Sequence, residues 1–170
     1  MKTTLKPYRH FNHAIGLATV HLVWIPCRRK HIFTVKNENM KLRCIDIFNS
    51  VASEKKWIIK ALEVAPDHIH LLVEYDPHHS ISQVIKAFKG RSSRYLRQEF
   101  PVLMKLPSLW TNSYMFDTTG KISTSKIMAY INDPHHGSNK LTASFNWLHY
   151  LRFARLYPWV KTTGLYAPFP

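Results

Sequence analysis

Hydrophobic and polar positions follow two kinds of pattern along the first half of the chain. The run GLATVHLVWIP, from Gly16 to Pro26, is apolar and β-branched and predicts a buried strand. Apolar residues at helical spacing predict an amphipathic helix over 37–56. WIIKALEVA (57–65) and HIHLLVEY (68–75) predict two further strands, and the turn-like Pro66-Asp67 between them predicts an antiparallel hairpin.

The second half of the pattern adds two helices and one strand. Ser80 is a suitable N-cap for a long amphipathic helix. Residues 101–109 contain two prolines and predict a loop, after which WTNSYMFDT (110–118) predicts a strand. A short helix, TSKIMAYIND (124–133), is expected to end at Pro134.

The resulting order, β-α-β-β-α-β-α, indicates an α+β protein. We expect an antiparallel β-sheet with helices packed on it, similar to split βαβ folds of the ferredoxin or RRM type. A length of 170 residues favours a single domain. We therefore divide the chain into a basic, irregular N-terminal arm (1–15), one domain (16–136) and a basic, aromatic C-terminal extension (137–170).

Charge and composition narrow the class of partner. The chain has 24 Lys and Arg against 10 Asp and Glu, a formal net charge of +14, which favours nucleic acid first and a membrane surface second. It contains no long apolar run, and MKTTLKPYRHFNH has no apolar signal core, so we expect no membrane segment and a cytoplasmic, nucleoid-associated protein. Cys27 and Cys44 lack zinc spacing and are interpreted as reduced structural thiols.

Two sequence features could carry chemistry. In PDHIHLLV, His68 and His70 project from one face of a strand, which fits either two ligands of a divalent metal or one buried histidine beside a hydrogen-bonded one. Tyr130 shares a helix face with Ile127 and Ile131, so it is either a core aromatic residue or a nucleophile that attacks a metal-polarised phosphate.

A third feature is a basic stripe along the helix that contains FKGRSSRYLR. Glu99 is the nearby acid in the sequence, so the stripe is predicted to be unpaired and suited to phosphates, although a solvated helix face is the alternative. Its members are Lys86, Lys89, Arg91, Arg94 and Arg97.

These motifs together resemble the small single-tyrosine HUH transposases of the insertion-sequence 200/605 group, where U is a hydrophobic residue. The resemblance extends from about Thr19 to Tyr130 and is carried by VHLVWIPCRRKHIF, ALEVAPDHIHLLV, IKAFKGRSSRYLR, LWTNSYMFDTTG and KIMAYI. It implies an HUH endonuclease fold. It also implies a transposase that cleaves and rejoins single-stranded DNA at the ends of a mobile element.

The resemblance implies roles for individual residues. Tyr130 would be the nucleophile that forms a 5′-phosphotyrosine, and His68 and His70 would bind a divalent metal, Mg²⁺ or Mn²⁺. The implied partners are single-stranded DNA with hairpins and a second copy of the chain, in a homodimer with shared active sites. To the groove that holds the single strand we assign Arg28, Arg29, Lys89, Arg91 and Arg94.

The third metal ligand departs from the family pattern. The family commonly has Gln or Asn one helical turn after the nucleophile, where this chain has Pro134. We favour Asp133 as the replacement because a carboxylate suits Mg²⁺ better than imidazole does. His135, His136 or a water molecule are the alternatives.

Two other functions stay open at this point. Without a third ligand the chain would be a catalytically inactive hairpin DNA-binding protein derived from such a transposase. A zinc hydrolase using His68 and His70 is a further hypothesis, for which the nearby acids are Glu63, Asp67 and Glu74, with Glu74 on the same strand face as the histidines.

Overall fold

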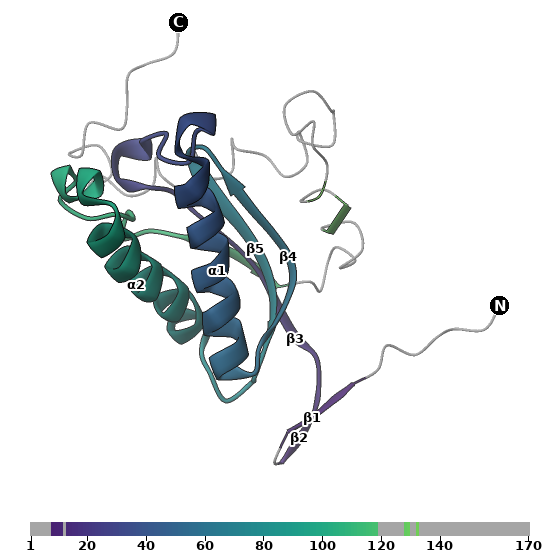
Figure 1. The fold of residues 1–170 in the computed structure, drawn as a ribbon. Helices are drawn as coiled ribbons and strands as arrows, with labels where there is room; N and C mark the ends of the chain where they lie inside the picture. The colour runs from purple at the N-terminus through teal and green to yellow at the C-terminus, as the bar shows by residue number, and fades with distance from the viewer. Residues whose placement is uncertain (1–7, 12, 119–127, 130–131, 133–170) are drawn as a thin grey trace, which may run out of the picture.

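A four-stranded antiparallel sheet in the order β4-β5-β3-β6 is the centre of the fold (Figure 1). The computed structural model describes residues 8–11, 13–118, 128–129 and 132. The strands of the sheet are β3 (Ala18–Trp24), β4 (Ile58–Ala65), β5 (His68–Tyr75) and β6 (Met115–Thr118). The two long helices are α1 (Glu38–Lys55) and α2 (Ile81–Glu99).

Both helices lie on the same face of the sheet (Figure 1). Alternate strand residues point toward them, because successive side chains of a strand project to opposite faces. These core residues include Val20, Leu22 and Trp24 of β3 and Ile69, Leu71 and Val73 of β5. The intervening residues of β3 and β5, among them His21 and His70, therefore belong to the opposite face of the sheet.

The predicted α+β architecture is confirmed, and most element boundaries agree closely with it. The strand predicted over 68–75 has those bounds in the structure. Ser80 caps α2 through a capping box: its hydroxyl accepts from the N–H of Gln83 at 3.2 Å, and the Gln83 side chain accepts from the N–H of Ser80 at 2.7 Å. Satisfying these first backbone donors explains why the helix begins there.

The N-terminal arm, which was expected to be irregular, forms strands in its second half, so the prediction is wrong there. Arg9–Phe11 (β1) and Ala14–Gly16 (β2) pair as a short antiparallel hairpin. Arg9 also contacts the main domain: its guanidinium donates to Glu74 of β5 at 3.4 Å and to the carbonyl of Lys56, directly after α1, at 3.1 Å. These contacts stabilise strands too short to be recognised from their alternation alone.

The loop and strand predicted over 101–118 also need correction. Pro101–Lys105 is a 3₁₀ helix (η3), and β6 includes only Met115–Thr118 of the predicted strand. Trp110 makes an isolated bridge to Pro26. Between Trp110 and β6 the carbonyl groups of residues 111–113 accept hydrogen bonds from the side chain of Lys89, so they do not join the sheet as a regular strand.

Only part of the last predicted helix is described. Met128 and Ala129 are helical, and the N–H of Asn132 donates to the carbonyl of Met128 at 3.0 Å. Tyr130, Asp133 and the extension over 137–170 lie outside the described residues. Within the described part of the chain, no helix is long and apolar enough to cross a membrane.

Candidate metal centre and basic surface

Two strands bring together three side chains whose chemistry suits a metal ion, on the sheet face opposite the helices. His68 and His70 follow one another on β5, with ring centroids 4.9 Å apart and the rings edge to face. Glu63 on β4 pairs in register with His70. One ligand atom from each of these three residues lies within 4.8 Å of the others, so a single ion can contact all three.

The register of the hairpin explains why Glu63 belongs to this group. Pro66 and Asp67 are the two turn residues, so Ala65 lies opposite His68 and Glu63 lies opposite His70. Counting back from this turn identifies Glu63 as the partner of His70, whereas proximity in the sequence marks it only as a nearby acid.

Glu74, which shares the strand face of the histidines, is engaged elsewhere. Its carboxylate is 2.8 Å from Lys60 Nζ and 3.4 Å from Arg9 Nη1. The residue is only 2% exposed, so these cations compensate a buried charge. Glu74 therefore stabilises the far end of the hairpin rather than the metal-binding group.

A hydrogen-bonded carboxylate lies behind His68. Asp67 Oδ1 is 2.6 Å from His68 Nδ1, and Asp67 Oδ2 accepts from Arg29 Nε at 2.6 Å. Burial by itself raises the pKa of the Asp67 carboxyl, but the hydrogen bonds from His68 and Arg29 outweigh burial and hold that pKa well below its usual range. Asp67 is thus an ionised acceptor at neutral pH.

A second histidine lies behind His70. His21 Nε2 is 3.1 Å from His70 Nδ1, and the two rings stack with centroids 5.3 Å apart. His21 is fully buried, and this burial lowers its pKa to about 4, so the ring is neutral at pH 7. Histidines that bind metal commonly hydrogen-bond through their other ring nitrogen, so the donors present fit a divalent cation.

The basic residues assigned to DNA divide into two groups in the structure. Three of them have partners within the protein. Arg29 binds Asp67, Arg91 forms an ion pair with Glu54 of α1, and Lys89 Nζ donates to the carbonyls of Thr111, Asn112 and Ser113. Arg28 and Arg94 are exposed.

The expectation of an unpaired stripe is therefore wrong for Lys89 and Arg91. Glu99, the acid expected to lie near the stripe, does not pair with it in the structure. Its carboxylate accepts two hydrogen bonds from Arg43 of α1, at 2.7 and 2.8 Å. The physical reason is that a wheel of α2 alone contains neither the charged residues of the neighbouring α1, Glu54 and Arg43, nor the backbone carbonyls of residues 111–113 that bind Lys89.

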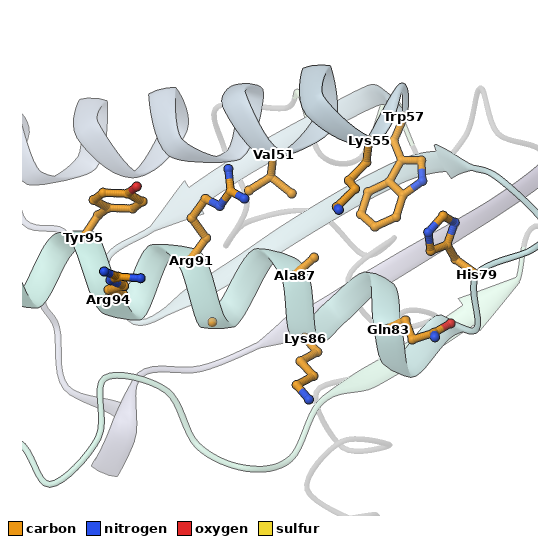
Figure 2. Close-up of a pocket in the computed structure, with 11 residues that line it drawn as sticks. Val51, Lys55, Trp57, His79, Gln83, Lys86, Ala87, Arg91, Arg94 and Tyr95 are labelled. Carbon is orange, nitrogen blue, oxygen red and sulfur yellow. The ribbon is translucent and has the colours of Figure 1, made fainter.

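A basic hollow of about 610 Å³ lies beside these helices. Figure 2 shows Arg91 of α2 extending toward α1, with Lys55 and Trp57 nearby. Cationic side chains hold phosphates and exposed aromatic rings stack bases; of the aromatic residues here Tyr95 is exposed, whereas Trp57 is buried. Those that line the hollow are Lys55, Trp57, His79, Lys86, Arg91, Arg94 and Tyr95.

The antiparallel sheet, the two helices on one face and the His-x-His pair on the other define an α+β protein of the HUH endonuclease fold. The family model described as "Transposase IS200 like" matches residues 14–134. That range contains the histidine pair, Glu63 and Tyr130. The chain belongs to the IS200-like transposase family and is therefore a DNA-binding transposase.

Individual relatives agree with this assignment. The ISDra2 transposase TnpA of Deinococcus radiodurans is 29% identical over 119 residues, which cover 68% of this chain and 82% of that protein. The transposase for insertion sequence element IS200 of Salmonella typhimurium is 33% identical over 115 residues, 65% of this chain and 72% of that protein. A crystal structure of a protein assigned as a transposase from D. radiodurans R1 matches with a TM-score of 0.59 and 28% identity, over 72% of this chain and 95% of that one.

Proposed function

We propose that this transposase cleaves and rejoins single-stranded DNA at the ends of a mobile element through a 5′-phosphotyrosine on Tyr130. The observation that carries the proposal is the convergence of Glu63, His68 and His70 within 4.8 Å on the face opposite the helices. A divalent cation bound there, Mg²⁺ or Mn²⁺, would supply Lewis-acid stabilisation of charge on the scissile phosphate.

The chain's own nucleophile then performs the exchange. The Oη of Tyr130 attacks the scissile phosphorus, its hydroxyl proton is released, and the P–O3′ bond breaks. The departing oxygen takes up a proton as a 3′-OH, and the 5′-phosphate stays esterified to Tyr130. Rejoining is the reverse reaction, in which a 3′-OH attacks a 5′-phosphotyrosine and restores the tyrosine. Because one phosphoester replaces another, no nucleoside triphosphate is consumed.

Glu63 is our candidate for the third ligand. It offers a carboxylate, which Mg²⁺ and Mn²⁺ prefer, from a strand that is already hydrogen-bonded to β5. Asp133, the position favoured from the sequence, remains the second candidate. Replacing each by its amide separates them: Glu63→Gln lowers Mn²⁺ affinity if Glu63 is the ligand, and Asp133→Asn does so if Asp133 is.

The DNA surface in this proposal includes Arg28 and Arg94 as exposed phosphate contacts, with Lys86 and Arg91 beside Arg94 in the hollow. Their contribution should be electrostatic, so binding should weaken steeply with salt. Lys86→Met and Arg94→Met should each reduce the slope of log affinity against log salt by about 0.7 for single strands. Lys105→Met, at an exposed cation of η3 that does not line the hollow, is the matched control.

The covalent step has a direct test. Labelled single-stranded oligonucleotides that tile the DNA flanking the gene are incubated with protein and Mn²⁺ or Mg²⁺, and a covalent adduct is followed on denaturing gels. Tyr130→Phe should remove the adduct while DNA binding survives, and Tyr8→Phe, on an exposed tyrosine, should keep it. An adduct that persists in Tyr130→Phe contradicts the assignment. Wild-type protein that binds hairpins but never forms an adduct identifies an inactive hairpin-binding protein instead.

The homodimer with shared active sites has its own test. If each site combines the histidines of one subunit with Tyr130 of the other, mixing inactive Tyr130→Phe and His70→Ala proteins restores adduct formation in the heterodimer. If each site lies within one subunit, every subunit in the mixture carries one inactivating substitution, and no adduct forms. Light scattering on the purified chain measures whether a dimer forms at all.

A further inference from the structure

We infer that Asp67 and Arg29 are positioning residues of the metal centre: Asp67 fixes the tautomer of His68, and Arg29 fixes Asp67. The inference rests on the metal site of the proposed function. It assigns Arg29 to the support of that site, behind Asp67, and separates it from Arg28, with which it shared a DNA-binding assignment.

The tautomer follows from the atoms that meet. Asp67 Oδ1 lies 2.6 Å from His68 Nδ1, and an ionised carboxylate can only accept a hydrogen bond. Nδ1 must therefore carry the proton. A neutral imidazole has a single N–H, so its second nitrogen, Nε2, carries the lone pair that a metal requires. The contact thus prepares His68 for coordination before any metal arrives.

Arg29 holds the carboxylate in that orientation. Its Nε donates to Oδ2 of Asp67 at 2.6 Å, so the two oxygens of one carboxylate serve Arg29 and His68 separately. The Asp67 side chain is 12% exposed and that of Arg29 is 39% exposed. His31 Nε2 also lies 3.9 Å from Oδ2, at 68% side-chain exposure, and contributes less because it is farther away and solvated.

The backbone conformation around Arg29 supports its contact with Asp67. Arg28 and Arg29 have φ of 56° and 49°, in the left-handed region that residues other than glycine rarely adopt. Backbone hydrogen bonds hold this turn: Cys27 N–H donates to the Leu109 carbonyl at 2.8 Å, Arg29 N–H to the Pro26 carbonyl at 2.9 Å and Lys30 N–H to the Cys27 carbonyl at 3.4 Å. Arg29 meets Asp67, and Arg28 is exposed on the outside of the same turn.

This pair of arginines supplies a matched experiment. Arg29→Met and Arg28→Met remove the same charge from adjacent positions with similar φ angles. Mn²⁺ affinity is measured by calorimetry without DNA, and the His68 tautomer is read by ¹⁵N NMR of the metal-free protein. Asp67→Asn completes the set, because an amide NH₂ can donate to Nδ1 and favour the proton on Nε2.

The expected results differ for each variant. Asp67→Asn should move the His68 proton toward Nε2 and weaken Mn²⁺ binding by about 10–100-fold. Arg29→Met should give a mixed His68 tautomer and a smaller loss of affinity. Arg28→Met should leave both measurements at wild-type values, and Arg29→Lys should recover part of what Arg29→Met loses.

Two outcomes overturn different claims. Equal Mn²⁺ affinity and His68 tautomer in wild type, Arg29→Met and Asp67→Asn overturn the inference and leave the proposed metal centre standing. A wild-type protein that binds no Mn²⁺ overturns the metal centre of the proposed function, and the inference with it. An intact amide NMR spectrum of Arg29→Met shows that any loss is local rather than a failure to fold.

Discussion

Replacing Lys89 with Met removes a cation that the structure uses internally, and its contacts allow the cost to be worked out. Lys89 Nζ donates to the carbonyls of Thr111, Asn112 and Ser113 at 2.6, 3.4 and 3.2 Å, and it lies 5.8 Å from the centre of the Tyr114 ring. These contacts connect α2 to the segment that leads into β6. Methionine keeps most of the apolar stem and removes the donor.

The expected loss is about 2 kcal/mol of unfolding free energy. A hydrogen bond from a charged group contributes about 1.5–3 kcal/mol, and two of the three contacts have good length. The total is smaller than their sum because the carbonyl groups, which lie on exposed or half-buried residues, can bind water in the variant. Removing the partly buried ammonium also removes its desolvation cost, which further reduces the net loss of stability.

Urea unfolding followed by tryptophan fluorescence at pH 7 measures this loss. With a slope of about 2 kcal/mol per M for a small protein, the midpoint of Lys89→Met should fall by about 1 M. Lys86→Met, an exposed lysine one turn earlier on the same helix, is the control and should change stability by less than about 0.5 kcal/mol. Equal midpoints for the two variants would refute the structural role of Lys89.

The difference in stability between wild type and Lys89→Met should also depend on pH. Burial lowers the pKa of Lys89 from 10.5 to about 8 in the folded protein. Between these values the unfolded chain binds a proton that the folded chain has released, so the Lys89 contribution to stability rises with pH over that window. The difference in unfolding free energy between wild type and Lys89→Met should therefore widen from pH 7.5 to pH 9.5, and a constant difference would contradict the lowered pKa of Lys89.

Three further predictions concern single contacts. Ser80→Ala removes the capping box of α2 and should lower the unfolding free energy by about 1 kcal/mol in urea. Ser92→Ala removes the buried hydroxyl that accepts from Trp110 Nε1 at 2.9 Å; leaving that N–H unpaired should cost about 1–3 kcal/mol, measured the same way. A thiol reagent should modify half-buried Cys27 in the folded protein but Cys44 only in urea, because burial raises the pKa of the Cys44 thiol.

Each of these predictions has a contrasting result. Ser93→Ala, inside the same helix, should not reproduce the loss seen for Ser80→Ala. Ser92→Ala as stable as wild type would mean that Trp110 finds another acceptor. Two thiols that react at equal rates in folded protein would contradict the burial of Cys44.

The hairpin of β4 and β5 was predictable because its information is local. Alternation marks the strands, and two turn residues set which positions face each other. The histidine pair follows from alternation within one strand. Glu63 follows from alternation only after the register is counted, which is why a list of nearby acids did not separate it from Glu74. The cations that bind Glu74, Arg9 and Lys60, come from β1 and β4 and become visible only in three dimensions.

The basic stripe was misjudged because its partners are distant in sequence. Glu54 is 37 residues from Arg91, and Thr111 is 22 residues from Lys89. A helical wheel shows how charges are arranged around one helix, but it does not show the residues of the helix or loop packed beside it. The turn at Arg28 and Arg29 is harder still, since neither residue type signals a positive φ. In the structure, backbone hydrogen bonds hold the turn, and the Arg29 side chain that leaves it meets Asp67, a residue distant in sequence.

The internal ion pairs determine which basic residues remain available to bind DNA. An ion pair uses one basic and one acidic residue, so pairs such as Arg91–Glu54 and Arg29–Asp67 leave the surplus of +14 unchanged. The surplus must then reside on the remaining basic residues, which include the exposed Arg28, Lys86 and Arg94. Phosphates attracted to the protein should meet those side chains first, because a cation already held by a carboxylate must exchange one anion for another. The salt dependence of DNA binding should therefore respond to Arg94 more than to Arg91, although the two are three residues apart on one helix.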